Sequence, residues 1–419
     1  MRPAAHQRLT SALWKILTLL TISVFINYID RGNLSIAAPL LKTELGLSAS
    51  QLGMLLSAFF WTYASAQLLS GWLVDRVDVY WVMAAGFFLW SSATAVTGIV
   101  HSFAVLFAVR LVLGLGESVA YPSYSKILAL HFPEDQRGFA NSLISAGLTS
   151  GPGFGMLVGG MLMARFGWRS FFVVLGIVSL LWLVPWFRWM PRRQSSAAPP
   201  LAGSAPTLAE FARLRSAWGS CGGLFCGNYI SYFLITWLPY YLVRERRFSM
   251  DKMGKIAGSA YLSAAVIGTV CGWLSDRWID AGASPTLVRK TFTAGGMGIA
   301  AIFLVATVIA PASLCVPALI CATIGFGICS SNIWAITQTL AGPPAAGRWT
   351  GMQNFVGNLS GVVAPALTGF VLDRTASFFW PFAIASLFAL LGASFWMFVI
   401  GAVEQVQWRG RVRAQAVSG

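Results

Sequence analysis

The feature that most constrains the fold of this chain is a succession of apolar runs, each long enough to cross a bilayer as a helix. A spanning helix needs about 20 consecutive, mostly apolar residues. Of the 419 residues, 57% are hydrophobic and only 10% are charged. A soluble chain of this length would need far more charge to cover its surface. The sequence therefore predicts a polytopic, all-α membrane protein.

Twelve such runs follow one another, with one long polar connection among them. The expected spans are residues 14–38, 50–74, 80–100, 102–129, 138–164, 169–190, 217–243, 254–275, 290–311, 313–339, 349–372 and 378–402. The polar connection, residues 191–216, is rich in Ser, Ala, Pro and Arg, as expected for a linker. It divides the chain into an N-terminal six-helix bundle (1–190) and a C-terminal one (217–403), followed by a tail (404–419).

The basic residues indicate a membrane topology rather than a nucleic-acid surface. The formal net charge is +15, but the lysines and arginines lie in short loops between the apolar runs. Their bias toward one side places both termini and the linker in the cytoplasm of an inner (plasma) membrane protein. The first apolar run continues through Asp30 and Arg31 without a small-residue cleavage site. We therefore expect a retained first helix rather than a signal peptide.

Motifs for other classes of protein are missing from the sequence. The six cysteines form no C-x-x-C pattern, and no His/Cys cluster has metal-ligand spacing. We find no G-x-S-x-G, H-E-x-x-H or Walker motif. We therefore expect no enzyme, no metal and no cofactor, and a gradient as the energy source. A solute sensor would need an added signalling domain, for which the tail after Glu404 is too short.

Charged residues stand inside two apolar runs of the first half. Arg110 and Glu117 are seven residues apart, about two turns, and so lie on one helix face. Asp30 and Arg31 are adjacent in the first run. Charges at membrane depth are costly unless they pair or face a wet cavity, so they mark functional pathways. A structural ion pair is the alternative, and we favour function because an uncharged packing surface is cheaper in hydrocarbon.

One hexapeptide pattern recurs in both halves. Gly-Trp-Leu-Val-Asp-Arg (71–76) closes the second run, and Gly-Trp-Leu-Ser-Asp-Arg (272–277) closes the eighth. A pattern that repeats six helices later indicates a duplicated bundle. The charged pair that ends each copy is expected to act in gating, by latching onto a neighbouring helix end. These gating candidates are Asp75, Arg76, Asp276 and Arg277.

The repeat resembles the G-x-L-x-D-R loop of the major facilitator superfamily, whose fold is twelve transmembrane helices in two six-helix bundles. This sequence departs from the family pattern after Arg76, where Val-Asp-Val-Tyr replaces glycine and basic residues. Residues 27–31 (Asn-Tyr-Ile-Asp-Arg), with Arg110, Glu117 and Tyr121-Pro122, resemble the anion:cation symporter branch. That branch includes bacterial galactonate, glucarate and hexuronate transporters, phthalate carriers, sialin and the vesicular glutamate transporters. The resemblance covers the chain from the first helix to the twelfth.

The resemblance implies roles for individual residues of the first half. Asp30 and Glu117 match the acids that carry protons in the branch. Arg31 and Arg110 match the arginines that pair with those acids and attract the substrate carboxylate. Tyr63 matches a tyrosine that hydrogen-bonds sugar-acid substrates in the galactonate carrier.

The second half offers uncharged polar groups at comparable depth: Asn228, Ser331, Asn332, Gln338, Asn354 and Asn358. By the same resemblance, Ser331, Trp334 and Asn354 fall where the galactonate carrier contacts its substrate. Asn228 is a further substrate-binding candidate. Guanidinium forks suit a carboxylate, while amides and hydroxyls suit a polyhydroxy chain. The alternative for each asparagine is a hydrogen bond between helices.

These observations predict a proton-coupled symporter that imports an organic anion by alternating access. A sugar acid (aldonate, aldarate or hexuronate) is the leading substrate. An aromatic carboxylate such as phthalate is an alternative, because Trp61, Trp334 and Tyr232 could stack on a ring. Anion exchange is a second alternative, because Gly147–Gly155 with Pro152 resembles a Gly-Pro motif of antiporters. In physical terms, however, this motif provides only close helix packing and a kink at the proline, so we favour the packing interpretation. We expect a monomer whose partners are the anion, protons and the bilayer, with no nucleic acid.

Overall fold

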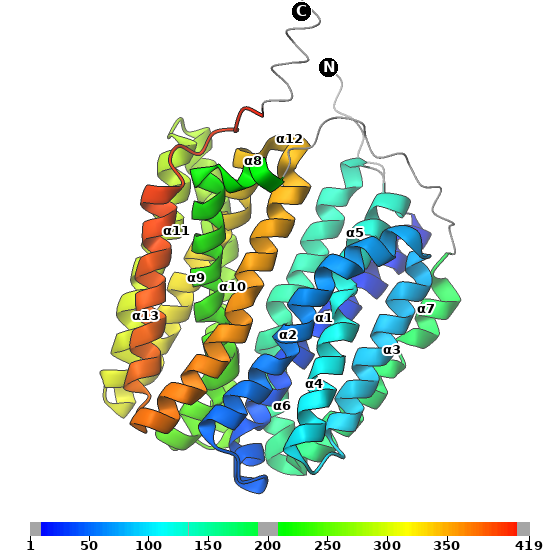
Figure 1. Cartoon of the computed structure of the whole chain (residues 1–419), viewed down its shortest axis with the longest axis vertical. Coiled ribbons are helices and arrows are strands. Elements are labelled where there is room, and N and C mark those ends of the chain that lie inside the picture. Colours follow the sequence, from blue (N-terminus) through cyan, green and yellow to red (C-terminus); the bar gives the residue numbers. More distant parts are fainter. Residues whose placement is uncertain (1–9, 133, 192–207, 409–419) are drawn as a thin grey trace, which may run out of the picture. The chain divides into compact units, whose positions relative to one another are not determined.

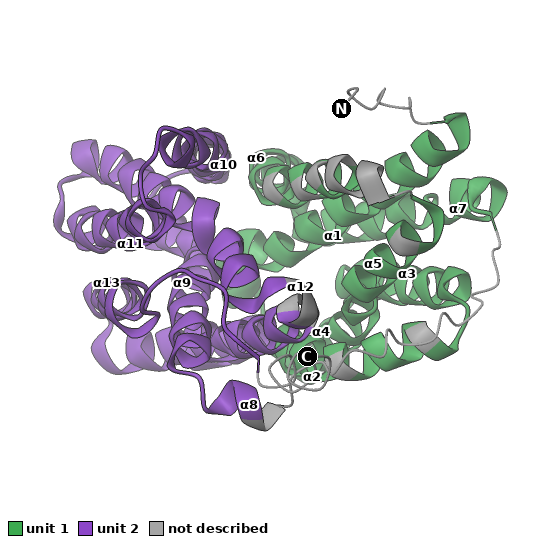
Figure 2. Cartoon of the chain, turned by 90° about the horizontal axis from the view of Figure 1, so that it is seen from above, with its two compact units in different colours: residues 1–45, 58–198 green, residues 46–57, 199–419 purple. Residues whose placement is uncertain are grey.

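The computed structural model describes residues 10–132, 134–191 and 208–408. This part of the chain is helical and contains no strand. The chain forms two compact units, one of residues 1–45 with 58–198 and the other of residues 46–57 with 199–419 (Figure 2). Residues 192–207, which make up most of the predicted linker, lie outside the described part.

Seven helices, labelled in Figure 1, belong mainly to the first unit. They are α1 (Ser11–Glu44), α2 (Ala49–Arg76), α3 (Val79–Thr97), α4 (Phe103–Ser118), α5 (Ala120–His131), α6 (Glu134–Leu180) and α7 (Leu183–Trp189). Helix α1 packs along α6, and α3 packs against both α4 and α6. Helix α2 belongs to the second unit up to residue 57 and to the first unit from residue 58.

The second unit contains the remaining helices (Figure 1). They are α8 (Leu208–Ala212), α9 (Arg215–Tyr240), α10 (Met250–Asp280), α11 (Pro285–Ile309), α12 (Ala312–Thr375) and α13 (Phe379–Ser394), with short π-helices at Tyr241–Glu245 and Phe395–Val399. Helix α12 packs against α9, α10 and α11, and α13 packs against α9 and α11.

Each of the twelve predicted spans lies in helical structure of the described chain, although residues 102–129 divide into α4 and α5 and residues 169–190 divide between α6 and α7. Among the described residues, nine helices are long and apolar enough to cross a membrane. The labels α6 and α12 each cover two helices that meet at a kink, at Gly167 and at Gly342, where the backbone is not helical. These glycines have φ of 77° and 62°, a left-handed conformation that glycine adopts without steric cost. The predicted fold class is therefore confirmed.

The glycines of the Gly-Pro motif pack α6 against α1. A Cβ atom added to Gly151 would lie 2.7 Å from Cβ of Tyr28, and helix α6 continues through Pro152. In the second unit, a Cβ on Gly357 would lie 2.8 Å from the Leu224 side chain. Glycines thus let the backbones of long helices approach closely, as small residues do in membrane bundles. The packing interpretation of these glycines is confirmed.

Replacing Gly151 by alanine is expected to lower the thermal unfolding midpoint of the protein in detergent. The added methyl group would press on Tyr28 and on the Phe25 carbonyl oxygen, 3.1 Å away, and overpacking of this kind costs about 1–3 kcal/mol. Gly295 is the matched control, because nothing lies within 4 Å of a Cβ placed there. Gly295→Ala should raise the midpoint or leave it unchanged, since alanine favours a helix more than glycine does. A lower midpoint for Gly295→Ala alone would contradict this account.

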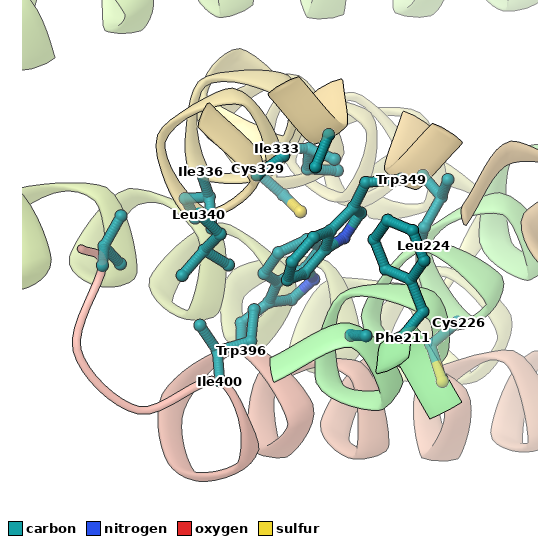
Figure 3. Packing of buried hydrophobic residues seen from close by; sticks show 14 of the residues in the cluster. Phe211, Leu224, Cys226, Cys329, Ile333, Ile336, Leu340, Trp349, Trp396 and Ile400 are labelled. Carbon is teal, nitrogen blue, oxygen red and sulfur yellow. The ribbon is translucent and has the colours of Figure 1, made fainter. Parts of the chain in front are cut away.

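The core of the second unit includes residues that the sequence assigns to the linker and the tail. Phe211 is fully buried, and its ring lies 5.2 Å from that of Trp408 and 5.6 Å from that of Trp349. The Trp408 indole Nε1–H donates to the Ala341 carbonyl oxygen at 2.9 Å. Figure 3 shows Phe211 and Trp349 in this cluster with Trp396 and Ile400. Aromatic packing therefore fixes residues 208–212 and 404–408 to the helices of this unit.

The first turn of α2 is held by the end of α12. The backbone N–H groups of Ala49 and Ser50 donate to the two carboxylate oxygens of Asp373, at 2.8 and 2.7 Å. Gly53 and Gly369 let the two helices approach next to this contact. A carboxylate at a helix N-terminus satisfies its free N–H groups and complements its dipole. This contact explains why residues 46–57 belong to the second unit.

Candidate functional site

The four charged residues predicted from the sequence are buried in the first unit. Asp30 and Arg31 lie on α1 with 2% and 9% exposure, and Arg110 and Glu117 lie on α4 with 4% and 0%. Charged side chains are almost never this deeply buried unless they are paired. The contacts of these four residues therefore define the candidate site.

The two glycines between Arg110 and Glu117 allow α4 to approach its neighbours. A Cβ on Gly114 would overlap the carbonyl oxygen of Phe59 on α2. A Cβ on Gly116 would lie 2.9 Å from the backbone nitrogen of Trp90 on α3. The glycines thus bring the charged residues of α4 close to the rings of α2.

Arg31 and Glu117 form a buried ion pair between α1 and α4. The Arg31 Nε–H donates to Glu117 Oε2 at 3.1 Å. The other oxygen, Glu117 Oε1, has no hydrogen-bond partner among the described residues. A buried ion pair contributes little net stability because both charges lose their hydration, but removing one partner leaves an uncompensated charge. The protonation state of Glu117 therefore controls how much of the Arg31 charge is neutralised.

Aromatic rings from α1 and α2 surround the Arg31 guanidinium. Its Cζ lies 4.4 Å from the ring centre of Tyr63, 4.6 Å from that of Tyr28 and 5.4 Å from that of Phe59. Tyr63 is thus placed at the site as predicted, whereas Phe59 was not identified from the sequence. Its spacing of four residues from Tyr63 was the available signal, because residues four apart share a helix face. The Tyr28 hydroxyl accepts a hydrogen bond from Tyr121 on α5 at 3.5 Å.

Asp30 and Arg110 make fewer polar contacts than the other pair. Asp30 Oδ1 accepts a hydrogen bond from Asn33 Nδ2 at 3.3 Å. Asp30 Oδ2 and Arg110 Nε have no hydrogen-bond partner in the described part of the chain, and neither atom of the buried Asn27 amide has one. Buried polar groups are nearly always hydrogen-bonded, so unsatisfied ones need an explanation. This group of donors and acceptors can bind water, a proton or an anionic ligand.

Among the second-half candidates, Ser331 is hydrogen-bonded within α12, next to a bond that Asn332 makes between helices. The Asn332 side chain donates to Ser331 Oγ at 3.0 Å, and its Oδ1 accepts from Ser275 Oγ of α10 at 2.9 Å. On the next part of α12, Asn358 Oδ1 accepts from the Tyr232 hydroxyl of α9 at 2.5 Å. The interhelical alternative is therefore confirmed for Asn332 and Asn358.

The described contacts do not join Asn228, Trp334 and Asn354 into one group with Ser331. The carbonyl oxygen of Asn354 accepts from the Asn358 side chain at 2.8 Å. The side chain of Asn228 lies next to Gly357, and that of Trp334 is 40% exposed. A substrate-binding role for these residues stays a prediction.

The arginines of the repeated hexapeptide make equivalent contacts in the two halves. Arg76 lies 4.7 Å from the ring centre of Trp72, and Arg277 lies 4.8 Å from that of Trp273. Each arginine thus packs on the tryptophan one turn earlier in its own helix. The side chain of Asp75 lies outside the described part of the structure, and Asp276 is exposed. The gating role stays a prediction.

Repeated bundles of membrane-length helices with charges buried inside one of them define a multi-pass membrane transporter rather than an enzyme. The chain belongs to the Major Facilitator Superfamily, whose family model matches residues 20–365. A crystal structure of a bacterial homologue of the human lysosomal transporter Spinster has the same fold. Its TM-score is 0.81 at 17% identity, covering 94% of this chain and 97% of that one.

Transporters of organic anions are among the relatives of this chain. An uncharacterized transporter of Bacillus subtilis, YybO, is 30% identical over 94% of this chain and 95% of its own length. The probable sulfoacetate transporter SauU of Cupriavidus necator is 31% identical, covering 90% and 91%. The probable galactarate/D-glucarate transporter GudP of Bacillus subtilis is 28% identical, covering 95% and 94%. The predicted resemblance to the anion:cation symporter branch is confirmed.

Proposed function

We propose that the protein is a proton-coupled symporter that imports an organic anion, foremost a sugar acid, by alternating access. The observation that carries the proposal is the buried Arg31–Glu117 ion pair with an uncommitted Arg110 donor on the same helix as Glu117. Two arginines and two carboxylates are nearly neutral together when both acids are ionised. Protonation of Glu117 and Asp30 makes the site electropositive, so that it binds an anion.

The coupling follows from charge balance. While Glu117 is ionised, its carboxylate competes with a substrate carboxylate for Arg31. A proton on Glu117 removes that competition, and guanidinium groups then bind the substrate carboxylate through paired hydrogen bonds. Anion and proton therefore occupy the site together, and the two bundles move to expose it on the other side of the membrane.

The names of the relatives favour a sugar acid. Galactarate and glucarate are polyhydroxy dicarboxylates, and sulfoacetate is a smaller organic anion. The aromatic carboxylate stays the alternative, because the Arg31 site suits carboxylates of any backbone and Trp61 and Trp334 are 44% and 40% exposed.

The proposed location is the inner (plasma) membrane, with both termini in the cytoplasm. The support is the excess of lysine and arginine on the side of the termini and the linker. In this orientation an inward proton gradient drives uptake into the cell.

Transport by purified protein in liposomes tests the proposal. The vesicles carry an inward proton gradient and are offered labelled galactarate, glucarate, galactonate, glucuronate, sulfoacetate and phthalate, with and without a protonophore. We expect accumulation of a sugar acid that the protonophore abolishes. If uptake occurs only when the vesicles are preloaded with an anion and the protonophore does not change it, the protein is an anion exchanger rather than a symporter. Accumulation of phthalate alone would favour the aromatic carboxylate.

A further inference from the structure

The Arg31 guanidinium is enclosed by three rings, which we call the aromatic cage: Tyr28, Phe59 and Tyr63. Phe59 and Tyr63 are 1% and 3% exposed, and their stacked rings have centres 5.1 Å apart. A cation over an aromatic face is attracted by the ring quadrupole, most strongly where water is excluded. The cage therefore attracts Arg31 without neutralising its charge.

Phe59 holds a special place in the cage because it contacts both arginines of the site. Its ring centre lies 5.4 Å from Cζ of Arg31 and 5.4 Å from Cζ of Arg110. The close approach of Gly114 to the Phe59 backbone fixes this part of α2 against α4. One ring on α2 thus contacts guanidinium groups from two other helices.

Like the coupling scheme above, a role for the cage depends on the charge of Glu117. In the described state, Arg31 is held partly by the Glu117 carboxylate. When that carboxylate is protonated, Arg31 loses this charge attraction, and its remaining contacts, those with the cage among them, hold it in the site. The other charged and titratable groups near the site are Asp30 and Arg110, and the tyrosines of the cage together with Tyr121 and Tyr124.

We propose that the aromatic cage is a positioning element, with Phe59 at its centre, that keeps Arg31 and Arg110 oriented toward the anion while Glu117 is uncharged. The proposal rests on the proposed function. Rings suit this task better than a second carboxylate, because a carboxylate would cancel the positive field that the anion needs. Phe59 acts through the arginines, because its ring has no polar atom to offer the substrate, whereas the predicted substrate contact of Tyr63 is a separate role of its hydroxyl group.

A double-mutant cycle tests the proposal. Galactarate binding to purified protein in detergent is measured by titration calorimetry for the wild type, Phe59→Leu, Glu117→Gln and the double variant. We expect Phe59→Leu to raise the Kd about tenfold, or about 1.4 kcal/mol, in the wild-type background. In the Glu117→Gln background, where the counter-charge is absent, the same change should raise the Kd at least a hundredfold. Phe59→Tyr, which keeps the ring, should restore binding to within about threefold in both backgrounds.

Controls separate positioning from loss of folding. Phe87 is a fully buried ring of α3 that packs between Trp90 and Trp182. Phe87→Leu should lower the thermal midpoint as much as Phe59→Leu does and leave the Kd unchanged. The positioning role of the cage would be overturned if Phe59→Leu raised the Kd by the same factor in the two backgrounds, or if Phe59→Leu and Phe59→Tyr had equal Kd values. Wild-type protein that binds none of galactarate, glucarate, galactonate and glucuronate would overturn the sugar-acid function, whereas binding that is equally sensitive to Phe59→Leu in both backgrounds would overturn the cage alone.

Discussion

Replacing Glu117 by glutamine is expected to abolish accumulation of substrate driven by a proton gradient, while exchange of substrate across the membrane continues. Glutamine has nearly the same shape as glutamate, so the packing around position 117 is kept, while the charge attraction to Arg31, 3.1 Å away, is lost. It carries no charge and takes up no proton. The site is then permanently in its anion-binding state, and binding no longer depends on a proton.

The measurement compares uphill uptake with counterflow in the same liposomes. Glu44→Gln is the matched control, because Glu44 is an acid of the same unit, on α1, whose carboxylate accepts hydrogen bonds from Trp168 Nε1 at 2.7 Å and Arg169 Nε at 2.9 Å. This control should keep both activities, since its acid has a structural role. Concentration of substrate against its gradient by Glu117→Gln would show that coupling lies elsewhere, with Asp30 the next candidate.

Replacing Arg110 by lysine is expected to raise the KM for the transported anion about 10- to 100-fold. A charged hydrogen bond contributes about 1.5–3 kcal/mol, and a lysine cannot offer the planar, two-pronged donor of a guanidinium. Arg110 is 4% exposed, and its Nε has no hydrogen-bond partner in the described residues. The structure thus leaves a donor of this arginine available to a ligand, while the charge is kept in the variant.

Arg169 provides the comparison for this variant within the same unit. Its guanidinium donates to Glu44 and, at 2.6 Å, to the carbonyl oxygen of Val100, so its donors are used in structure. Arg169→Lys should lower the thermal midpoint and leave the KM within about twofold of wild type. The initial rate of uptake at varied substrate concentration gives the KM of Arg110→Lys and of Arg169→Lys. An unchanged KM for Arg110→Lys would exclude Arg110 as a ligand of the carboxylate.

The two units use their polar residues differently. In the first unit, charged groups meet around Arg31 and several of their atoms have no described partner. In the second unit, the described contacts engage Asn332 and Asn358 in hydrogen bonds between helices. Substrate recognition by the second unit is therefore better sought among side chains next to these pairs, such as Ser331 and Asn354, than in the pairs themselves.

Much of the fold followed from the sequence because bilayer thickness fixes the length of a spanning run. The twelve apolar runs correspond to helical segments, and the repeated hexapeptide marks equivalent helix ends in the two halves. The predicted breaks at residues 164–169 and 339–349 coincide with Gly167 and Gly342, where two helices meet at a kink. Other joins were less predictable, because the predicted spans 102–129 and 169–190 each divide between two helices. Phe211 and Trp408 lie in segments that are polar on average, so the composition of these segments did not indicate that the two rings are buried in the core.

The sequence by itself determined which groups are chemically exceptional: Asp30, Arg31, Arg110 and Glu117 stand out because charge at membrane depth is costly whatever the fold. Only the tertiary structure decided how they combine. Arg31 pairs with Glu117, 86 residues away, rather than with the neighbouring Asp30, and Phe59 rather than another ring of its aromatic run contacts both arginines. Periodicity gives the face of one helix, but partners across helices depend on how closely backbones approach, which here is set by glycines packed against their neighbours.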